Sequence, residues 1–195
     1  MIANESPPIL SRTVALRCFV PADAPKMFAM SREPGVRAWL PDQVYESEAH
    51  ALDVVRYLIE SCRDPGTPSL APYVLGVCAR DLGELIGHVG LSPLDGQVEI
   101  GFAVEQGRQR EGIASEAVRA LAEWALPRFA LPRVLAIAAT DNVASCKVLE
   151  HAGFQLLEET VRSLHGRSGH VRTYERAAAR DEASWVERAS GPHRA

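Results

Sequence analysis

The chain has 195 residues, of which 47% are hydrophobic and 24% are charged. This balance is typical of a soluble globular protein with one domain, and the length is too small for two ordinary domains. A formal net charge of −4 gives no excess of basic residues, so we expect neither a nucleic-acid partner nor an anionic membrane partner. No apolar run approaches the roughly 18 residues of a membrane-spanning helix, and the N-terminus lacks a signal-peptide pattern.

The cysteine pattern predicts neither a metal site nor a disulfide framework. The four cysteines form no Cys-x-x-Cys pair and no metal-ligand pattern with the six histidines. We therefore expect a chain with reduced thiols, no metal ion and a cytoplasmic location. The cysteines are Cys18, Cys62, Cys78 and Cys146.

The first third of the chain predicts one strand and two helices. Residues 13–20 alternate apolar and polar side chains, as a half-buried strand does. Residues 21–23 then predict a turn and a helix start, and this helix is expected to stop at residues 33–35, which read Glu-Pro-Gly. A second helix is expected after Ser47, with one apolar stripe, and it should end in the Pro-rich and Gly-rich residues 64–68.

Three short strands separated by turn residues are expected next, which is typical of an antiparallel meander. They cover residues 72–79, 84–91 and 98–104. A helix after Gly112 carries one apolar face, and Pro127 should end or kink it.

The last part of the chain predicts a strand, a helix and two further strands. These cover residues 134–140, 143–152, 154–162 and 170–176. The tail from residue 177 is expected to fray.

The loop between the third meander strand and the next helix predicts an anion cradle. The first N–H groups of a helix have no intrahelical acceptor and lie at the positive end of the helix dipole, which suits a pyrophosphate. Gly112 permits the backbone to approach the pyrophosphate closely, and the side chain of Ala114 at the helix start is small. Neither G-x-G-x-x-G nor G-K-[ST] occurs, which excludes an ordinary dinucleotide or nucleoside-triphosphate loop.

Two motifs resemble the Gcn5-related N-acetyltransferase (GNAT) superfamily. Residues 109–114 read Q-x-x-G-x-A, which is similar to the acetyl-CoA loop of that superfamily. Residues 142–154 read N-x-x-S-x-x-V-L-E-x-x-G-F, which resembles the element that closes the other side of the cofactor. Residues 36–41 and 99–102 look most like the RimJ/RimL branch, whose members include ribosomal-protein N-terminal acetyltransferases.

The resemblance implies an α/β (α+β) fold of the GNAT type, with a single mixed, mostly antiparallel seven-stranded sheet flanked by about four helices. It places the acetyltransferase domain at residues 11–176, between an N-terminal extension of residues 1–10 and a C-terminal tail of residues 177–195. It also implies acetyl-CoA as the acyl donor, no metal, and direct transfer of the acetyl group to a primary amine.

The same resemblance assigns the cofactor-binding residues. The backbone of the third meander strand would hold the pantetheine and the thioester carbonyl, and the loop that follows would bind the phosphates. Asn142 would cap a helix and touch the cofactor as well, whereas the case for Arg110 is mainly electrostatic. The full set is Phe102, Ala103, Val104, Gln109, Arg110, Glu111, Gly112, Ile113, Ala114 and Asn142.

For catalysis, the resemblance makes Glu99 the first candidate for the general base. The alternative for Glu99 is a carboxylate in solvent or in an ion pair, and Glu84 and His88 are weaker candidates for the same role. Many GNAT enzymes use a tyrosine as the acid where this chain has Leu149. Ser145 is therefore the candidate acid, and its alternative is ordinary capping of the helix start.

The acceptor class follows from amine pKa values. At pH 7 an α-amine is roughly 15% neutral and a lysine amine only about 0.04% neutral, so weakly defined base residues favour a peptide N-terminal α-amine. Small-molecule amines such as an antibiotic, a polyamine or an amino acid stay open. The rival function is a non-catalytic acyl-CoA-binding regulatory module on the same fold, and we expect a monomer or homodimer.

Overall fold

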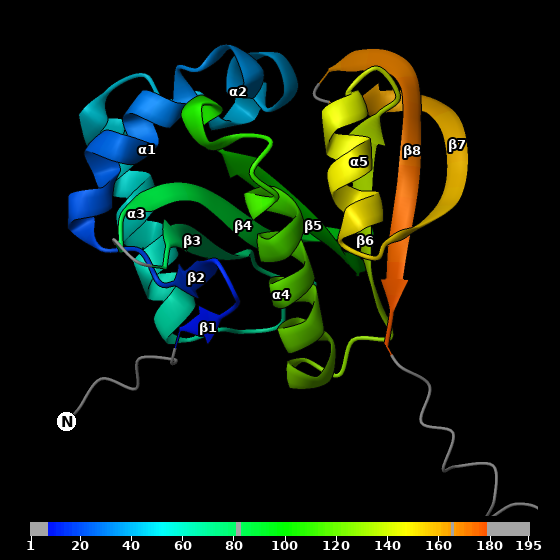
Figure 1. The fold of residues 1–195 in the computed structure, drawn as a ribbon, viewed down its shortest axis with the longest axis horizontal. Helices are drawn as coiled ribbons and strands as arrows, with labels where there is room; N and C mark the ends of the chain where they lie inside the picture. The colour runs from blue at the N-terminus through cyan, green and yellow to red at the C-terminus, as the bar shows by residue number, and fades with distance from the viewer. Residues whose placement is uncertain (1–7, 81–82, 165, 179–195) are drawn as a thin grey trace, which may run out of the picture.

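One mixed sheet of eight strands organises the part of the chain that the computed structural model describes, residues 8–80, 83–164 and 166–178 (Figure 1). The strand order is β1-β2-β3-β4-β5-β6-β8-β7. Neighbouring strands are antiparallel except β5 and β6, which are parallel. The strands are β1 (Ile9–Leu10), β2 (Val14–Arg17), β3 (Tyr73–Ala79), β4 (Leu85–Leu94), β5 (Gln97–Val104), β6 (Arg133–Ala139), β7 (Gln155–Leu164) and β8 (Arg167–Ala177).

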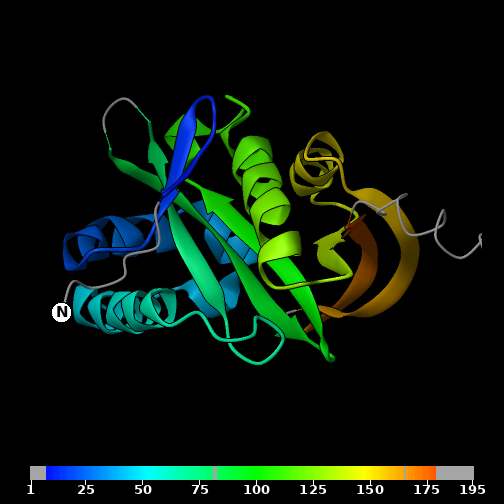
Figure 2. The same cartoon turned by 90° about the horizontal axis from the view of Figure 1, so that it is seen from below.

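Helices cover both faces of this sheet, with α4 and α5 on one face and α1 and α3 on the other (Figure 2). One buried cluster joins α4 and α5 to the sheet through residues such as Leu121 and Leu149. A second cluster, around Met27 and Val55, lies beneath α1 and α3. The helices are α1 (Ala24–Ser31), α2 (Pro34–Trp39), α3 (Glu48–Arg63), α4 (Ile113–Arg128) and α5 (Val143–His151), with 3-10 turns η1 (Pro21–Asp23), η2 (Pro41–Gln43) and η3 (Gln106–Arg108).

The predicted fold class is confirmed, and two short elements raise the counts among the described residues to eight strands and five helices. The additional strand β1 has two residues, too few for a readable alternation, and it pairs with β2 through Ile9 and Leu16. The additional helix α2 begins at Pro34, inside the sequence that was expected only to stop α1. Proline suits the first position of a helix, so the same residues separate α1 from α2 and open α2. The tail beyond residue 178 lies outside the described residues.

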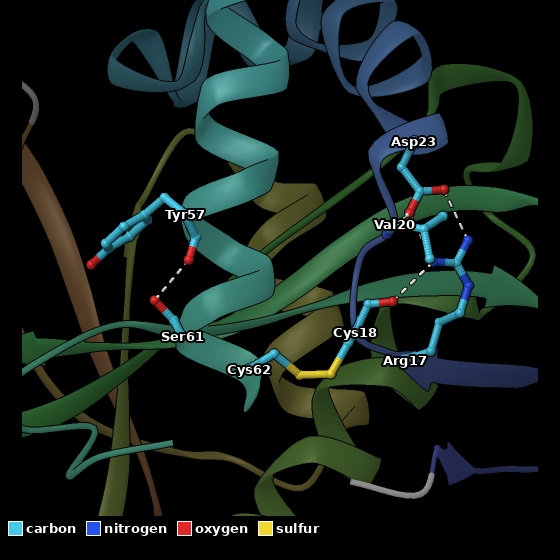
Figure 3. Close-up of a disulfide and its surroundings, with 7 residues drawn as sticks. All are labelled: Arg17, Cys18, Val20, Asp23, Tyr57, Ser61 and Cys62. Atoms are coloured by element: carbon cyan, nitrogen blue, oxygen red, sulfur yellow. Dashed lines mark hydrogen bonds and ion pairs between the residues drawn. A yellow bond between two sulfur atoms is a disulfide. The ribbon is translucent and has the colours of Figure 1, made fainter. Parts of the chain in front are cut away.

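The expectation of four reduced cysteines is wrong, because Cys18 and Cys62 form a disulfide (Figure 3). Their Cα atoms lie 5.9 Å apart, and the bond joins the connection after β2 to the last turn of α3. The other two cysteines, Cys78 and Cys146, are free and buried. The pairing escaped the sequence because 44 positions separate the two partners, a distance at which no local spacing rule applies.

We expect the disulfide to stabilise the fold by about 2–4 kcal/mol, because it restricts the unfolded chain. Reduction should therefore lower the Tm by several degrees in a thermal unfolding experiment with and without a phosphine reductant. The Cys18→Ser/Cys62→Ser double variant is the control, since its Tm should not respond to the reductant. An equal response of both proteins would show that the disulfide contributes no such stability.

A buried carboxylate, that of Glu116, links the hairpin of β1 and β2 to α4. Glu116, in the first turn of α4, is 7% exposed and accepts hydrogen bonds from Ser11 Oγ at 2.6 Å and from the Thr13 amide at 3.0 Å. Burial alone raises the pKa of this carboxyl, but the hydrogen bonds from Ser11 and Thr13 favour the charged form and lower the pKa to about 2. The charged form of Glu116 is therefore part of the folded state at neutral pH.

This low pKa predicts a loss of stability in acid. A carboxyl whose pKa is lower in the folded state stabilises the protein above its unfolded pKa and loses that effect as the pH falls through the folded pKa. Between about pH 4.5 and pH 2 the loss from Glu116 should amount to up to about 3 kcal/mol. Urea unfolding across this range should show a shallower decline for Glu116→Gln than for the parent protein. The exposed Glu48→Gln variant should follow the parent, and parallel curves for all three proteins would contradict the assignment.

Candidate functional site

The parallel strands β5 and β6 pair at one position and leave an open backbone edge beyond it. Within the described residues, the pairing joins Glu99 to Leu135, and the two strands then separate toward their carboxyl ends (Figure 1). The other edge of β5 remains paired with β4 as far as Val104 and Gly87. Backbone N–H and C=O groups need hydrogen-bond partners. The edge of β5 that faces β6 is therefore suited to an extended ligand that lies along Phe102, Ala103 and Val104.

The two faces of β5 carry different side chains at this opening. Successive side chains alternate between faces, so Glu99 and Gly101 share the face covered by α1 and α3. Glu99 is half-buried. Gly101 is exposed, and a Cβ atom there would meet no atom within 4 Å. The sheet surface next to Glu99 is thus open to a small group that approaches from this face.

The start of α4 has no side-chain cap. Its N-cap residue is Gly112, which has a φ of +78° and is exposed. A Cβ atom at Gly112 would meet nothing within 4 Å, so the space next to this N-cap residue is open. Of the other helices, α3 and α5 begin with side-chain caps from Ser47 and Asn142, whereas α1 and α2 also begin without one. The predicted anion cradle therefore has the geometry of a helix start left open for a ligand.

The loop before α4 is held by its own side chains. Gln109 Nε2 donates to the Val104 carbonyl at 3.1 Å, which folds the loop back on the end of β5. Arg108 and Glu111 form an ion pair at 3.0 Å. Arg110 adopts a φ of +68°, a left-handed conformation that is uncommon for a residue with a side chain. These features give the loop a defined shape before any ligand is present.

The start of α5 brings two predicted residues together. Asn142 Oδ1 accepts a hydrogen bond from the Ser145 amide at 3.1 Å, so Asn142 caps the helix as expected. Ser145 is half-buried in the first turn of α5. Leu149 is 1% exposed and packs in the main core. An apolar core side chain therefore occupies the position at which the sequence resemblance implies a tyrosine in many relatives.

The geometry argues against the two weaker candidates for the base. His88 Nε2 lies 2.9 Å from Gln43 Oε1, and burial lowers the pKa of His88 to about 4, which makes it a poor proton acceptor from an amine. Glu84 pairs with Lys26 at 3.5 Å. His88 lies opposite Ala103 on β5, and Ala103 is four positions from Glu99 on the same strand. Because side chains an even number of positions apart point to the same face, His88 and Glu99 share one face of the sheet. Of these carboxylates, Glu99 is the one on the strand that forms the opening.

Sequence reasoning missed the contacts that tie the α1–α2 region to the cradle loop. Glu33 Oε2 accepts from the Gln106 amide at 2.8 Å, and Lys26 forms an ion pair with Glu105. Glu33 is also the N-cap residue of α2. Glu33 and Gln106 are 73 positions apart, so no local pattern pointed to this bond. The two regions that border the opening are therefore linked by polar contacts.

Comparison with known proteins identifies the family. The family described as acetyltransferase (GNAT) domain matches residues 13–155, and the chain belongs to this family. It is 34% identical over 92 residues to the uncharacterized N-acetyltransferase YjdG of Bacillus subtilis (strain 168), a match that covers 46% of this chain and 55% of YjdG. The chain spans about half the length of the curated relatives that it matches first, with 55%, 47% and 54% of their lengths covered.

Solved structures show the same fold at low identity. An acetyltransferase (GNAT family) from Bacillus anthracis has a TM-score of 0.74 at 18% identity, covering 88% of this chain and 98% of that one. RimL, a ribosomal L7/L12 alpha-N-protein acetyltransferase in complex with coenzyme A, has a TM-score of 0.71 at 21% identity, with 88% of this chain and 98% of that chain covered.

Among the residues described, no helix has the length and apolar character to span a membrane. The same residues hold no group of three or more metal-ligating side chains of the His, Cys, Asp and Glu types.

Proposed function

We propose that this chain transfers the acetyl group of acetyl-CoA directly to a primary amine, with the α-amine of a protein or peptide N-terminus as the preferred acceptor. The observation that carries the proposal is the open edge of β5 running into the uncapped start of α4. This arrangement offers a strand edge for the pantetheine arm and a helix start for the pyrophosphate. Family membership supports it, and so does the fold shared with RimL, which binds coenzyme A.

The proposal assigns cofactor contacts to three groups of residues. The backbone from Phe102 to Val104 would hold the pantetheine and the thioester carbonyl. The loop from Gln109 through Arg110, Glu111, Gly112 and Ile113 to Ala114 would bind the phosphates, chiefly through backbone amides. Asn142 would contact the cofactor from the start of α5. Bound acetyl-CoA supplies an activated acyl group, and no metal is needed for the transfer.

The proposed chemistry needs two proton transfers, and the two residues that would perform them approach from opposite faces of the sheet. Glu99 lies on the face of α1 and α3, where an amine can approach over Gly101, and it would accept a proton from the attacking amine. Ser145 belongs to α5, which covers the opposite face, and it would donate a hydrogen bond or a proton to the departing thiolate. Both residues lie on elements next to the place where β5 and β6 stop pairing, so we place the reacting carbon between them.

The preference for an α-amine rests on the weakly defined set of base residues at the opening. One half-buried carboxylate is the basic group that the opening presents, and an α-amine needs about 3.5 kcal/mol less than a lysine amine to become neutral at pH 7. The printed name of RimL, an alpha-N-protein acetyltransferase, agrees with this preference. A cytoplasmic location belongs to the same proposal, and in that reducing compartment the Cys18–Cys62 disulfide would be subject to reduction.

The function is tested by measuring release of free coenzyme A by chromatography with a series of amine acceptors. We expect turnover with peptides that have a free N-terminus and little turnover with the same peptides when the N-terminus is blocked and a lysine is present. Turnover with small-molecule amines alone would redirect the acceptor assignment. Binding of acetyl-CoA without turnover on any amine would instead support the non-catalytic regulatory module.

The cradle is tested by two substitutions of equal size. Gly112→Asp and Gly112→Asn add similar side chains at a left-handed position that Asn and Asp tolerate better than other residues, but only Asp adds a charge next to the phosphates. We expect Gly112→Asp to bind acetyl-CoA about 10-fold or more weakly than Gly112→Asn in calorimetric titrations. Equal affinities for the two folded variants would place the phosphates elsewhere.

The role of Glu99 is tested by the pH dependence of the rate. Glu99→Gln should lower kcat/KM by about 100- to 10,000-fold, and the defect should shrink at high pH because the acceptor amine is then already neutral. Glu84→Gln is the control and should retain the parent profile. If Glu99→Gln lowers the rate equally at every pH, then Glu99 acts by positioning rather than as a base.

The role of Ser145 is tested by single-turnover kinetics. Coenzyme A thiolate is a fairly good leaving group, so Ser145→Ala should slow the chemical step by about 10- to 100-fold, at or below the usual range for a general acid. Affinity for acetyl-CoA should change little, and Ser145→Cys should retain part of the rate. A parent rate in Ser145→Ala would mean that water or the substrate protonates the thiolate.

A further inference from the structure

The two outer strands of the sheet differ in how they are protected against pairing with another strand. One outer strand is β1, which has two residues, and the other is β7, which has ten and lies beyond β8 (Figure 1). Native sheets often shorten an outer strand or place lysine or proline on it, because its free N–H and C=O groups can pair with a further chain. β7 is long and contains neither lysine nor proline. Its outer edge is therefore a candidate interaction surface.

Most of β7 is regular and its apolar side chains are exposed. Residues 158–164 pair with β8 without interruption, because the irregularity in register lies before them, between Leu156 and Glu158. In the part of the chain that the structure describes, β8 is the only strand that pairs with β7. Leu156 is 54% exposed, Leu157 48% and Val161 62%. Exposed apolar side chains beside free backbone groups favour the addition of another strand.

The charges that β7 leaves without an ion pair are complementary to each other. Glu159 pairs with Arg172 on β8 at 2.9 Å. Within the described residues, neither Glu158 nor Arg162 has an ion-pair partner, and Glu158 accepts only a long hydrogen bond, 3.5 Å, from Thr173. Glu158 and Arg162 share one face but lie four positions apart, about 13 Å along a strand, so they cannot pair within one copy. The two glutamates and two arginines together carry no net charge.

Symmetry limits the ways in which two copies of β7 can pair. A twofold axis perpendicular to the sheet relates two antiparallel copies of one strand, so the residues on either side of a central residue lie opposite each other. With Thr160 at the centre, Glu158 of each copy lies opposite Arg162 of the other, and the two Thr160 side chains face each other. Opposite charges and threonine pairs stabilise such a ladder. A centre at position 158, 159 or 162 would place like charges opposite each other, and a centre at 161 would pair no opposite charges.

We propose that the outer edge of β7 is an interface between two copies of this chain, in which the two β7 strands pair antiparallel about Thr160 and join the two sheets into one. A second copy fits because it supplies an arginine opposite Glu158 and a glutamate opposite Arg162. It also brings the two exposed Val161 side chains diagonally across from each other on the other face. A ladder of residues 157–163 is about 23 Å long, so the interface is small and its Kd should be about 10 µM.

The interface extends the face of the sheet that carries Glu99. Leu135 on β6 lies opposite both Glu99 on β5 and Glu175 on β8. Glu158 on β7 lies opposite Thr173, which is two positions from Glu175. Because opposite residues and residues two positions apart point to the same face, Glu158 and Glu99 share one face. The second copy therefore enlarges the surface on the acceptor side without using any residue of the proposed site.

The interface is tested by sedimentation velocity of the full chain from about 1 to 500 µM. We expect the apparent mass to rise from that of one chain, 21.2 kDa, toward twice that value. Glu158→Arg and Arg162→Glu each create two like-charge pairs and should weaken the dimer at least about 10-fold. Arg119→Glu, the same charge reversal at an exposed position of α4, is the control and should match the parent.

Mixing the two single variants tests the register. In a mixed dimer of Glu158→Arg and Arg162→Glu, opposite charges again face each other at both places, so the mixture should associate about as tightly as the parent. A Thr160→Cys variant should form a disulfide-linked dimer under mild oxidation, since the two positions face each other. In Ser163→Cys the cysteines lie three positions beyond the centre in each copy, about 20 Å apart, and should not be linked. The native free cysteines are buried.

Four results would overturn the proposal. A parent protein that stays monomeric at the highest concentration shows that the edge of β7 does not bind a second copy. A dimer that is equally stable in the parent and in both folded single variants, as judged by circular dichroism, has its interface elsewhere. A mixture that associates no more tightly than the single variants alone contradicts the pairing of Glu158 with Arg162. Equal cross-linking of Thr160→Cys and Ser163→Cys contradicts the centre at Thr160.

Discussion

The arrangement of the whole site depends on the single backbone pair between β5 and β6. Strands that run parallel place their carboxyl ends at the same edge of a sheet, and here each carboxyl end leads through a short loop into a helix, α4 after β5 and α5 after β6. Both helix starts therefore lie at the mouth of the gap. Because the two strands stop pairing beyond Glu99 and Leu135, the backbone groups of β5 that face β6 have no strand partner there.

This geometry explains why so few side chains identify the site. In the site that we propose, an open strand edge and an uncapped helix start would bind through backbone groups, which every residue possesses. The sequence must then supply mainly permissive residues, such as Gly101 and Gly112, where a side chain would fill the opening or resist a positive φ. The remaining side chains have the narrower tasks of shaping the loop, as Gln109 does, and of moving protons, as we propose for Glu99 and Ser145.

The features that could be predicted from the sequence are those set by neighbours in the chain. The caps by Ser47 and Asn142 depend on contacts three residues away, and both were readable as helix starts. The alternation of β2 and the apolar stripe of α3 likewise depend on local periodicity. For the same reason the two motifs that resemble GNAT elements could be placed on strand-to-helix junctions, which the structure has at these positions.

The features that could not be predicted depend on residues that the fold brings together from far apart. Glu116 meets Ser11 across 105 positions, and His88 meets Gln43 across 45. The two-residue strand β1 exists because β2 and α4 provide partners for it, and α2 begins at a proline that also reads as a stop. In each case the sequence contains the chemical groups but carries no local sign of their partners.

The disulfide also changes the topology of the chain. It closes a covalent ring that contains α1, α2 and α3 as far as Cys62, so the helices on the Glu99 face form one cyclic segment attached to the sheet. A protease that cut the backbone once between positions 18 and 62 would leave a single covalently connected molecule. Such a nick would separate the chain into two fragments only after the sulfur–sulfur bond had been opened.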